Sequence, residues 1–321
     1  MKREQKKPLR HDPTPSLAPR PTQLVQKENC WAGRFQAMAC DCEILVDTDE
    51  QVLAKKMLRL AAGEAWRIER KFSRYRKGNI IDRINHGKGA AVVVDEECAQ
   101  LLNFAHQCHE ISEGMFDITS GVLRRIWKFD GSNRIPTQRQ VEKILPLIGW
   151  EKVSWTPPVI RVPESMEIDL GGIGKEYAVD CIFRLLREKF APAVLVNLGG
   201  DTVAGGKRRD GQPWNIGIEN DDPRRSAVKV IQVRQGAVAT SGDSKRFLLK
   251  DGKRYGHILN PRTGWPAENA PHSMTVAANT CTEAGFLSTL AMLHGEEAES
   301  VLEAEGVRYW CSRGRNDLAE E

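Results

Sequence analysis

The chain has 321 residues, of which 40% are hydrophobic and 28% are charged, a composition typical of globular proteins and unlike that of disordered or fibrous chains. Residues 1–28 hold seven Lys or Arg against three acidic residues and so carry the whole net charge of +4. The remaining chain has 40 basic and 40 acidic residues. Its charge therefore gives no indication of a nucleic-acid-binding surface, which needs basic residues clustered on the folded domain.

Residues 1–28 also contain five prolines and no apolar periodicity. They are predicted to form a disordered tail, because they bury too little apolar surface to offset the entropy of ordering. A solubilising extension is favoured over a tail that binds a partner or an anionic surface. The chain lacks the continuous apolar stretch of a secretory signal and any run of about 18 apolar residues that could span a membrane, so a cytoplasmic protein is expected.

Eight cysteines are scattered along the chain without a C-x-x-C pair, and in a chain without a secretory signal they are expected to be reduced. His106, Cys108 and His109 lie close together on a predicted helix. Residues one to three apart on a helix do not all face the same way. A metal site at this cluster is therefore the less favoured interpretation.

The predicted elements follow one another without a regular strand–helix–strand repeat. The segment 35–46 ends in a strand-like alternation, and 51–74 has apolar residues at helical spacing. A short strand and a helix are expected at 91–114, ending near Gly114. The later predictions are a loop and helix at 115–129, a helix within 136–155, an extended hairpin-like region at 158–172, a helix at 174–190, strands within 193–206, 214–220, 228–242, 246–260 and 273–279, and two helices at 282–306.

Strands clustered beside helices in this order predict an α+β fold, with a mixed, largely antiparallel sheet and flanking helices. Four glycine-rich segments stand out as candidates for function. In DLGGIGKEYAVD the glycines allow a ligand to approach the backbone, and Lys175 stands at the start of a predicted helix. A glycine turn that opens a helix favours a phosphate group, because unpaired N–H groups and the helix dipole meet there. The spacing matches no standard nucleotide motif, so on this segment alone a structural turn is an equal alternative.

The other three segments are weaker signals by themselves. They read NLGGDTVAGG, ATSGDSKRF, which contains Asp243, and YGHILNPRTGWP, which contains His257 beside a rigid Asn-Pro turn. A lone histidine beside a strand is more often structural than catalytic. Arg262 is compatible with a phosphate contact and equally with an exposed turn.

Taken together, the order and spacing of eight segments resembles the ApbE family, the FAD:protein FMN transferases. The resemblance extends from about Phe35 to Gly306, and the predicted organisation is one ApbE-like domain at 29–310 with a C-terminal tail at 311–321. The matching segments are FSRYRKGNIIDRIN, GMFDITSGVLRRIWKF, IDLGGIGKEYAVD, VLVNLGGD, GQPWNIGIEN, AVATSGDSKRF, YGHILNPRTG and AGFLSTLAMLHG.

The resemblance implies a compact α+β enzyme with FAD in a cleft. It implies that the enzyme transfers the FMN half of FAD to a threonine or serine hydroxyl of a partner flavoprotein, releases AMP and uses a divalent cation such as Mg²⁺. Carried over by position, the residues expected to hold FAD are Met38, Tyr75, Asp117, Gly172, Lys175, Glu219 and Arg262.

The same resemblance implies catalytic and metal-binding residues. His257 is expected to assist deprotonation of the acceptor hydroxyl, a task suited to a side chain with an unperturbed pKa near 6.5, and Asp243 lies in the matching Ser-Gly-Asp segment. The implied metal ligands are the main-chain carbonyl of Gly174 and the hydroxyl of Thr289.

One departure concerns the metal ligands. Relatives usually read A-D-A-L-A-T where this chain reads AGFLST, so Gly285 stands where a metal-ligating aspartate is expected. Glu283 lies two residues earlier, about 200° around a helix, and replaces that aspartate only if the helix begins late. The chain also reads GKEY where many relatives read A-K-G-Y, and it has Ser244 where an aromatic residue is common. We interpret these changes as a subgroup signature.

The predicted function is therefore FMN transfer from FAD to a partner protein. Two alternatives stay open at the level of sequence. An FAD-binding carrier or assembly factor without transfer is motivated by Gly285, and an FAD pyrophosphatase would use water as the acceptor.

Overall fold

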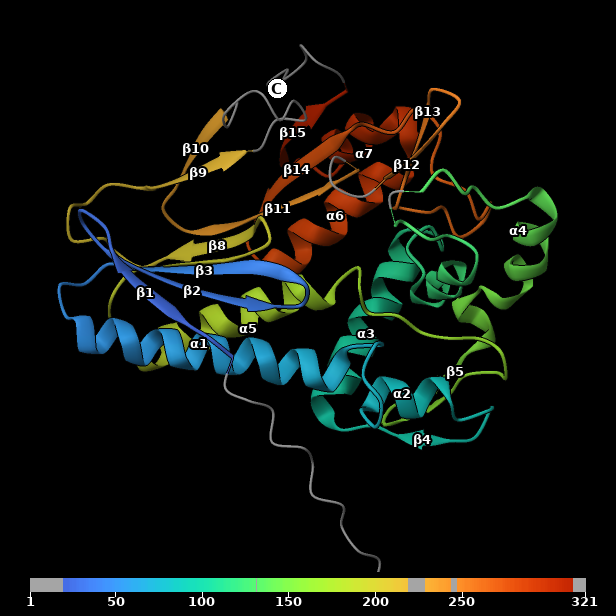
Figure 1. The fold of residues 1–321 in the computed structure, drawn as a ribbon, viewed down its shortest axis with the longest axis horizontal. Coiled ribbons are helices and arrows are strands. Elements are labelled where there is room, and N and C mark those ends of the chain that lie inside the picture. Colours follow the sequence, from blue (N-terminus) through green and yellow to red (C-terminus); the bar gives the residue numbers. More distant parts are fainter. Residues whose placement is uncertain (1–19, 131, 219–228, 244–246, 314–321) are drawn as a thin grey trace, which may run out of the picture.

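The computed structural model describes residues 20–130, 132–218, 229–243 and 247–313. Its centre is an eight-stranded antiparallel sheet in the order β1-β2-β3-β7-β8-β11-β14-β15 (Figure 1). The strands are β1 (Gln23–Gln26), β2 (Trp31–Ala37), β3 (Cys40–Val46), β7 (Val194–Leu198), β8 (Asp201–Gly205), β11 (Gly236–Gly242), β14 (Ser273–Ala278) and β15 (Arg308–Ser312).

Three helices cover one face of this sheet (Figure 1). They are α1 (Gln51–Phe72), α5 (Gly174–Lys189) and α6 (Cys281–Leu293). Gly33 on β2 leaves room for the first of them, α1, because a Cβ at Gly33 would lie 2.8 Å from Cδ1 of Leu58 on that helix. The last of them, α6, is buried around nearly its whole circumference, as its apolar sequence requires. This core fixes the helices relative to β8 and β11.

The opposite face of the sheet is covered by the antiparallel pair β9 (Trp214–Ile218) and β10 (Lys229–Val233). Trp214 packs there with Leu195 of β7 and Trp310 of β15. The central strands are therefore buried on both faces. This explains why the segment 193–206 has an almost continuous apolar sequence rather than an alternating one.

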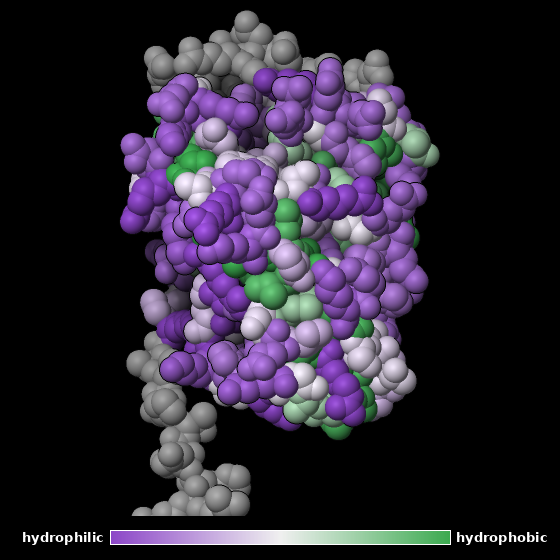
Figure 2. All heavy atoms as spheres, turned by 90° about the vertical axis from the view of Figure 1, so that its right-hand side faces the viewer, coloured by the Kyte–Doolittle hydropathy of each residue, from purple (hydrophilic) through white to green (hydrophobic). Residues whose placement is uncertain are grey.

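A second lobe, which includes residues 122–148 and 248–265, lies beside the sheet (Figure 1) and has its own apolar cluster around Trp127. The Trp127 indole Nε1 donates to the main-chain oxygen of Gly264 at 2.9 Å, which ties two distant segments together. Figure 2 shows a mainly hydrophilic surface on this side, with a small group of hydrophobic side chains near its centre. The remaining elements are α2 (Ile80–Asn85), β4 (Val92–Val93), α3 (Glu96–Ile111), the 3₁₀ helix η1 (Ile118–Arg125), α4 (Gln138–Ile144), η2 (Leu145–Leu147), η3 (Trp150–Lys152), β5 (Ser154–Thr156), β6 (Val159–Arg161), β12 (Phe247–Lys250), β13 (Lys253–Gly256), η4 (Gly295–Glu297) and α7 (Ala298–Ala304).

The predicted α+β class is confirmed, and every strand pair among the described residues is antiparallel. Two predicted boundaries are wrong. The expected disordered tail of 1–28 includes β1, whose residues pair in register with β2 through main-chain bonds that need no apolar pattern. The expected C-terminal tail of 311–321 includes the end of β15. Residues 1–19 and 314–321 lie outside the described residues.

Other differences are local. The helix expected within 115–129 is the 3₁₀ helix η1, and the hairpin-like region 158–172 forms a single strand, β6, which pairs with β4 and β5. All eight cysteines are free thiols. Within the described part of the chain, no helix combines the length and the apolar character that a membrane crossing needs.

Candidate functional site

An open cleft of about 2510 Å³ is lined by described residues of the central strands, α5, α6 and the second lobe. This volume exceeds the roughly 300–1,000 Å³ of a site for a drug-sized ligand, so the cleft has room for a dinucleotide. Gly172, Lys175 and His257 all line it. Two segments far apart in the sequence, the glycine turn with Gly172 and Lys175 and the segment that holds His257, therefore meet in one place.

The glycine turn before α5 forms one wall of the cleft. Asp169 organises it by accepting from Gly171 N at 3.0 Å and by pairing with Arg74. A Cβ at Gly172 would lie 3.3 Å from the Phe116 ring, so the turn has little room for a side chain. The first N–H of α5, that of Gly174, is bonded to the main-chain oxygen of Leu170 at 2.7 Å. The helix nevertheless brings the positive end of its dipole to this wall, which suits a phosphate group.

Lys175 extends from this turn into an ion pair. Its Nζ lies 2.5 Å from Oδ2 of Asp201, whose side chain is only 2% exposed. Burial alone would lower the pKa of Lys175, but the carboxylates of Asp201 and Glu176 outweigh it and raise that pKa above its usual value. Lys175 is therefore an ammonium ion at neutral pH, held at the cleft wall.

Asp201 and Glu176 form a pair of buried carboxylates behind Lys175. Asp201 follows a tight turn at Gly199 and Gly200, which have φ of 63° and 107°, and its Oδ1 accepts from Thr240 N at 3.2 Å. Burial, and then the charge of Asp201, raise the pKa of Glu176 well above its usual range. Two carboxylates and one ammonium thus share this end of the cleft.

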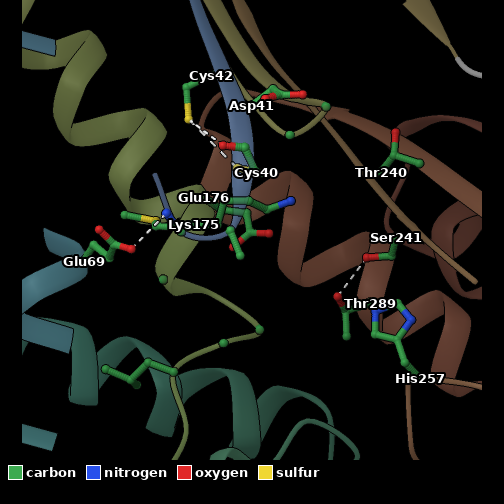
Figure 3. Close-up of a pocket in the computed structure, with 18 of the residues that line it drawn as sticks. Cys40, Asp41, Cys42, Glu69, Lys175, Glu176, Thr240, Ser241, His257 and Thr289 are labelled. Carbon is green, nitrogen blue, oxygen red and sulfur yellow. Dashed lines mark hydrogen bonds between the residues drawn. The ribbon is translucent and has the colours of Figure 1, made fainter. Parts of the chain in front are cut away.

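Hydroxyl groups line the adjoining wall, where β11 meets α6. Ser241 Oγ lies 2.9 Å from both Ser288 Oγ and Thr289 Oγ1. Figure 3 shows Ser241 and Thr289 in the same pocket as Lys175 and Glu176. This wall offers neutral oxygen donors close to the charged groups of α5.

His257 follows β13 and enters the cleft from the second lobe (Figure 3). Its ring meets Phe129 edge-on, with centroids 6.2 Å apart. Asp243 does not line the cleft; its carboxylate pairs with Arg254 at 2.9 Å and lies 3.5 Å from His272 Nδ1. The structure thus brings His257, but not the Asp243 carboxylate, to the cleft surface.

Two of the residues predicted to hold FAD, Met38 and Tyr75, lie at the surface of the cleft. Met38 lines the cleft at a positive φ of 52°, and its main-chain N donates to Glu69 Oε1 at 3.3 Å. Tyr75 also lines the cleft and is 79% exposed, with the Arg74 guanidinium 4.9 Å from its ring centroid. An exposed aromatic ring at a cleft edge is available for stacking.

The structure places the other residues predicted to hold FAD as follows. Asp117 lines the cleft, but its buried carboxylate accepts from Thr119 N, Thr119 Oγ1 and Trp150 N at 2.6–2.9 Å. Arg262 lies on an exposed turn outside the cleft lining and donates to the main-chain oxygen of Glu113. Glu219 lies outside the described residues.

The histidine–cysteine cluster on α3 does not converge on one point. Cys108 is buried in the core, and burial raises the pKa of its thiol to about 12. His106 Nδ1 accepts from the Trp150 indole at 2.9 Å. The described residues instead bring ligand atoms of His109, Asp117 and Glu151 within 4.8 Å of one another, although the Asp117 carboxylate already has three protein donors.

The oxygen atoms at the α5 and α6 wall fit a hard divalent cation. Gly174, which opens α5, and Thr289 both line the cleft, and carbonyl, hydroxyl and carboxylate oxygens are the ligands that Mg²⁺ takes. Glu176 Oε2 is buried and has no hydrogen-bond partner within the described structure. Glu283 is excluded as the replacement for a carboxylate at position 285, because α6 already begins at Cys281 and Glu283 is not a lining residue.

Sequence reasoning missed Glu176, Asp201 and Ser241. The signal for Glu176 was present, since its unusual appearance in GKEY accompanies the glycine at position 285. Nothing in the local sequence marks Asp201 or Ser241 as parts of the same wall, because strand pairing and helix packing bring them there.

Comparison with known proteins identifies the relatives. Residues 38–310 match the model of the ApbE family. The FAD:protein FMN transferase of Vibrio cholerae is 31% identical over 237 residues, with 72% of this chain and 71% of the relative covered. That of Salmonella typhimurium is 27% identical over 313 residues, with 87% and 89% covered.

Solved structures agree with these matches. The ApbE protein of Thermotoga maritima is 31% identical with a TM-score of 0.77, and the alignment covers 88% of this chain and 94% of that one. The flavin transferase ApbE of Vibrio cholerae is 26% identical with a TM-score of 0.76, covering 93% and 96%. The fold is therefore shared over nearly the full length of both proteins.

Proposed function

The chain belongs to the ApbE family, and from this premise we propose that it transfers the FMN half of FAD to a threonine or serine hydroxyl of a partner flavoprotein and releases AMP. The observation that carries the proposal is that Gly172, Lys175 and His257 line a single cleft. A diphosphate needs charge neutralisation and backbone donors, and an acceptor hydroxyl needs a nearby base. This cleft offers both.

In this proposal the diphosphate of FAD lies against the turn at Gly172 and the N-terminus of α5, with the Lys175 ammonium beside it. The Asp201 carboxylate restrains Lys175, so that the ammonium is held in position before the substrate arrives. Tyr75 stacks on a ring of the flavin or adenine, and Met38 lies along the same wall. Asp117 supports this wall by capping η1.

The chemical step is a substitution at the phosphorus of the FMN half. The acceptor hydroxyl oxygen attacks this phosphorus, and its proton passes to a ring nitrogen of His257. A new phosphorus–oxygen ester bond forms, the bond of that phosphorus to the bridging oxygen breaks, and AMP leaves with that oxygen. Lys175 stabilises the negative charge that develops on the departing phosphate.

A divalent cation such as Mg²⁺ would be held by the main-chain oxygen of Gly174 and the hydroxyl of Thr289, and when bound it supplies neutralisation of phosphate charge. The hydroxyl of Ser241 lies 2.9 Å from Thr289 Oγ1 and orients it. The roles of these residues in this chain are part of the proposal.

The test is to incubate the purified chain with FAD, MgCl₂ and a flavoprotein domain that carries a candidate acceptor threonine. We expect equal amounts of AMP, measured by HPLC, and of covalent flavin on the acceptor, measured by in-gel fluorescence. Release of AMP and free FMN without an adduct would replace the proposal with FAD hydrolysis. Tight FAD binding without AMP release would replace it with a carrier function.

A further inference from the structure

The side chain of Glu176 places a buried carboxyl group at the cleft. Glu176 is the third residue of α5, is 8% exposed and lines the cleft. Its Oε2 has no hydrogen-bond partner among the described residues. The preceding residue, Lys175, forms its ion pair with Asp201. Buried carboxylates are normally paired or bound to a metal, so this oxygen is available as a ligand for a cation.

The space that Glu176 occupies belongs to position 285. A Cβ built on Gly285 would lie 2.5 Å from Glu176 Cγ, 3.2 Å from Cδ and 3.4 Å from Oε1. Any side chain at position 285 would therefore collide with Glu176. The glutamate reaches from α5 across to the backbone of α6 only because position 285 is glycine.

No backbone requirement explains this glycine. Gly285 lies inside α6, between Cys281 and Leu293, and is not among the residues with positive φ. Glycine is unfavourable in a helix interior because it loses more conformational freedom than other residues. Making room for Glu176 gives the glycine a physical role.

The contact with position 285 also sets Glu176 against the face of α6 that carries Thr289. Thr289 follows Gly285 by one helical turn, so that the two positions lie on one face of α6, about 6 Å apart along its axis. Gly174 lies two residues before Glu176 at the start of α5. A carboxylate, a hydroxyl and a main-chain carbonyl are suited to a hard cation such as Mg²⁺ or Mn²⁺.

We propose that Glu176 supplies the carboxylate ligand of the divalent cation from α5, in place of the aspartate that the family resemblance leads one to expect at position 285 on α6. The glutamate at 176 and the glycine at 285 are one coupled exchange, which moves the carboxylate from one helix to its neighbour. This inference rests on the proposed function for the need of a cation, but its test measures cation binding itself.

The test measures binding of Mn²⁺ to the full chain with FAD, without any acceptor protein, by isothermal titration calorimetry and by electron paramagnetic resonance of free Mn²⁺. Glu176→Gln preserves the shape of the side chain and removes its charge. We expect this variant to bind Mn²⁺ at least about ten-fold more weakly, because even the loss of a group that only hydrogen-bonds to a metal ligand costs about 10–100-fold in metal affinity. Glu283→Gln is the matched control on α6 and should bind Mn²⁺ as the unaltered chain does.

The exchange itself is tested by moving the carboxylate back. Gly285→Asp alone should lower the thermal midpoint, because its Cβ overlaps Glu176 Cγ. The double variant Glu176→Gly with Gly285→Asp should regain both the thermal midpoint and Mn²⁺ affinity within a few-fold of the original. Glu176→Gly alone should bind Mn²⁺ weakly.

A measurement on the unaltered chain covers the case in which a variant does not fold. In crystals grown with FAD and Mn²⁺, the anomalous peak should lie roughly 2.0–2.6 Å from a Glu176 oxygen. Unchanged Mn²⁺ affinity in Glu176→Gln, absence of Mn²⁺ binding, or a peak away from Glu176 would overturn the inference. If Glu176→Gln binds Mn²⁺ normally and still transfers flavin, the inference is refuted and the proposed function stands. If Mn²⁺ binding depends on Glu176 but the unaltered chain neither transfers flavin nor releases AMP, the proposed function is refuted and the inference stands.

Discussion

Removing the ammonium of Lys175 is expected to destabilise the unliganded protein more than neutralising its partner does. Lys175 Nζ lies 2.5 Å from Asp201 Oδ2, and the Asp201 side chain is 2% exposed. Glu176 is a second buried carboxylate beside this pair. Lys175→Met leaves the buried Asp201 carboxylate without its ammonium partner, whereas Asp201→Asn leaves Lys175 beside Glu176.

The expected magnitudes follow from this asymmetry. Removing one partner of a buried ion pair costs about 3–5 kcal/mol, because the other charge stays buried. The Lys175 side chain is 28% exposed, so we expect Lys175→Met near the lower end of that range. For Asp201→Asn we expect about 1–3 kcal/mol, the cost of a buried hydrogen-bonding group that is left poorly matched.

Equilibrium unfolding in guanidinium chloride, followed by circular dichroism in the presence of EDTA, measures both changes from the midpoint and slope. The larger loss should belong to Lys175→Met. Equal losses, or a larger loss for Asp201→Asn, would refute the assignment of Lys175 as the cation that compensates the buried Asp201 carboxylate.

Three further predictions concern the stability of the second lobe, the stability of the protein at acidic pH, and His257 as the proposed base. Trp127→Phe removes the donor to Gly264 and should lower the free energy of unfolding by about 1–3 kcal/mol in chemical denaturation. Hydrogen bonds from Arg67 hold the pKa of Glu97 at about 2, below its usual value. The ionised Glu97 therefore stabilises the fold above its unfolded pKa, and this stabilisation is lost as the pH falls from about 4.5 towards 2. Glu97→Gln should remove that part of the loss of stability on acidification, measured by urea unfolding at a series of pH values. His257→Asn should slow flavin transfer by about 10²–10⁴-fold while FAD affinity, measured by fluorescence titration, changes little.

Matched controls separate these effects from general damage. Trp155→Phe removes an indole donor to Asn103 in an exposed place and should change stability by no more than about 0.5 kcal/mol. His86→Asn alters a histidine whose side chain is 79% exposed and which does not line the cleft, so transfer should be unaffected. A similar loss in control and test variants, or an unchanged acid limb in Glu97→Gln, would contradict the corresponding prediction.

The elements that follow from local patterns were predictable from sequence. The apolar spacing of α1 and α5 is set by the face that each helix presents to the sheet, and the run at 193–206 is set by burial on both faces. Strand β1 was not predictable in this way, because main-chain pairing with β2 holds it and requires no apolar residues. The same reason applies to the end of β15.

The same distinction between local patterns and contacts between distant segments applies to the candidate site. The glycine turn and Lys175 are recognisable because their chemistry is local to one segment. The contact of Glu176 with Gly285 is not, because it depends on how α5 packs against α6. Arg262 resembles a phosphate ligand in its sequence, but the fold turns its guanidinium towards the backbone of Glu113.

The most direct test of the account is the intact mass of an acceptor domain after incubation with the chain, FAD and MgCl₂. We predict a mass increase equal to one esterified FMN, located on a threonine or serine by tandem mass spectrometry and absent when that residue is replaced by alanine. An acceptor of unchanged mass, from a reaction in which a family member with known activity modifies the same domain, would contradict the claim that this cleft transfers FMN to a protein.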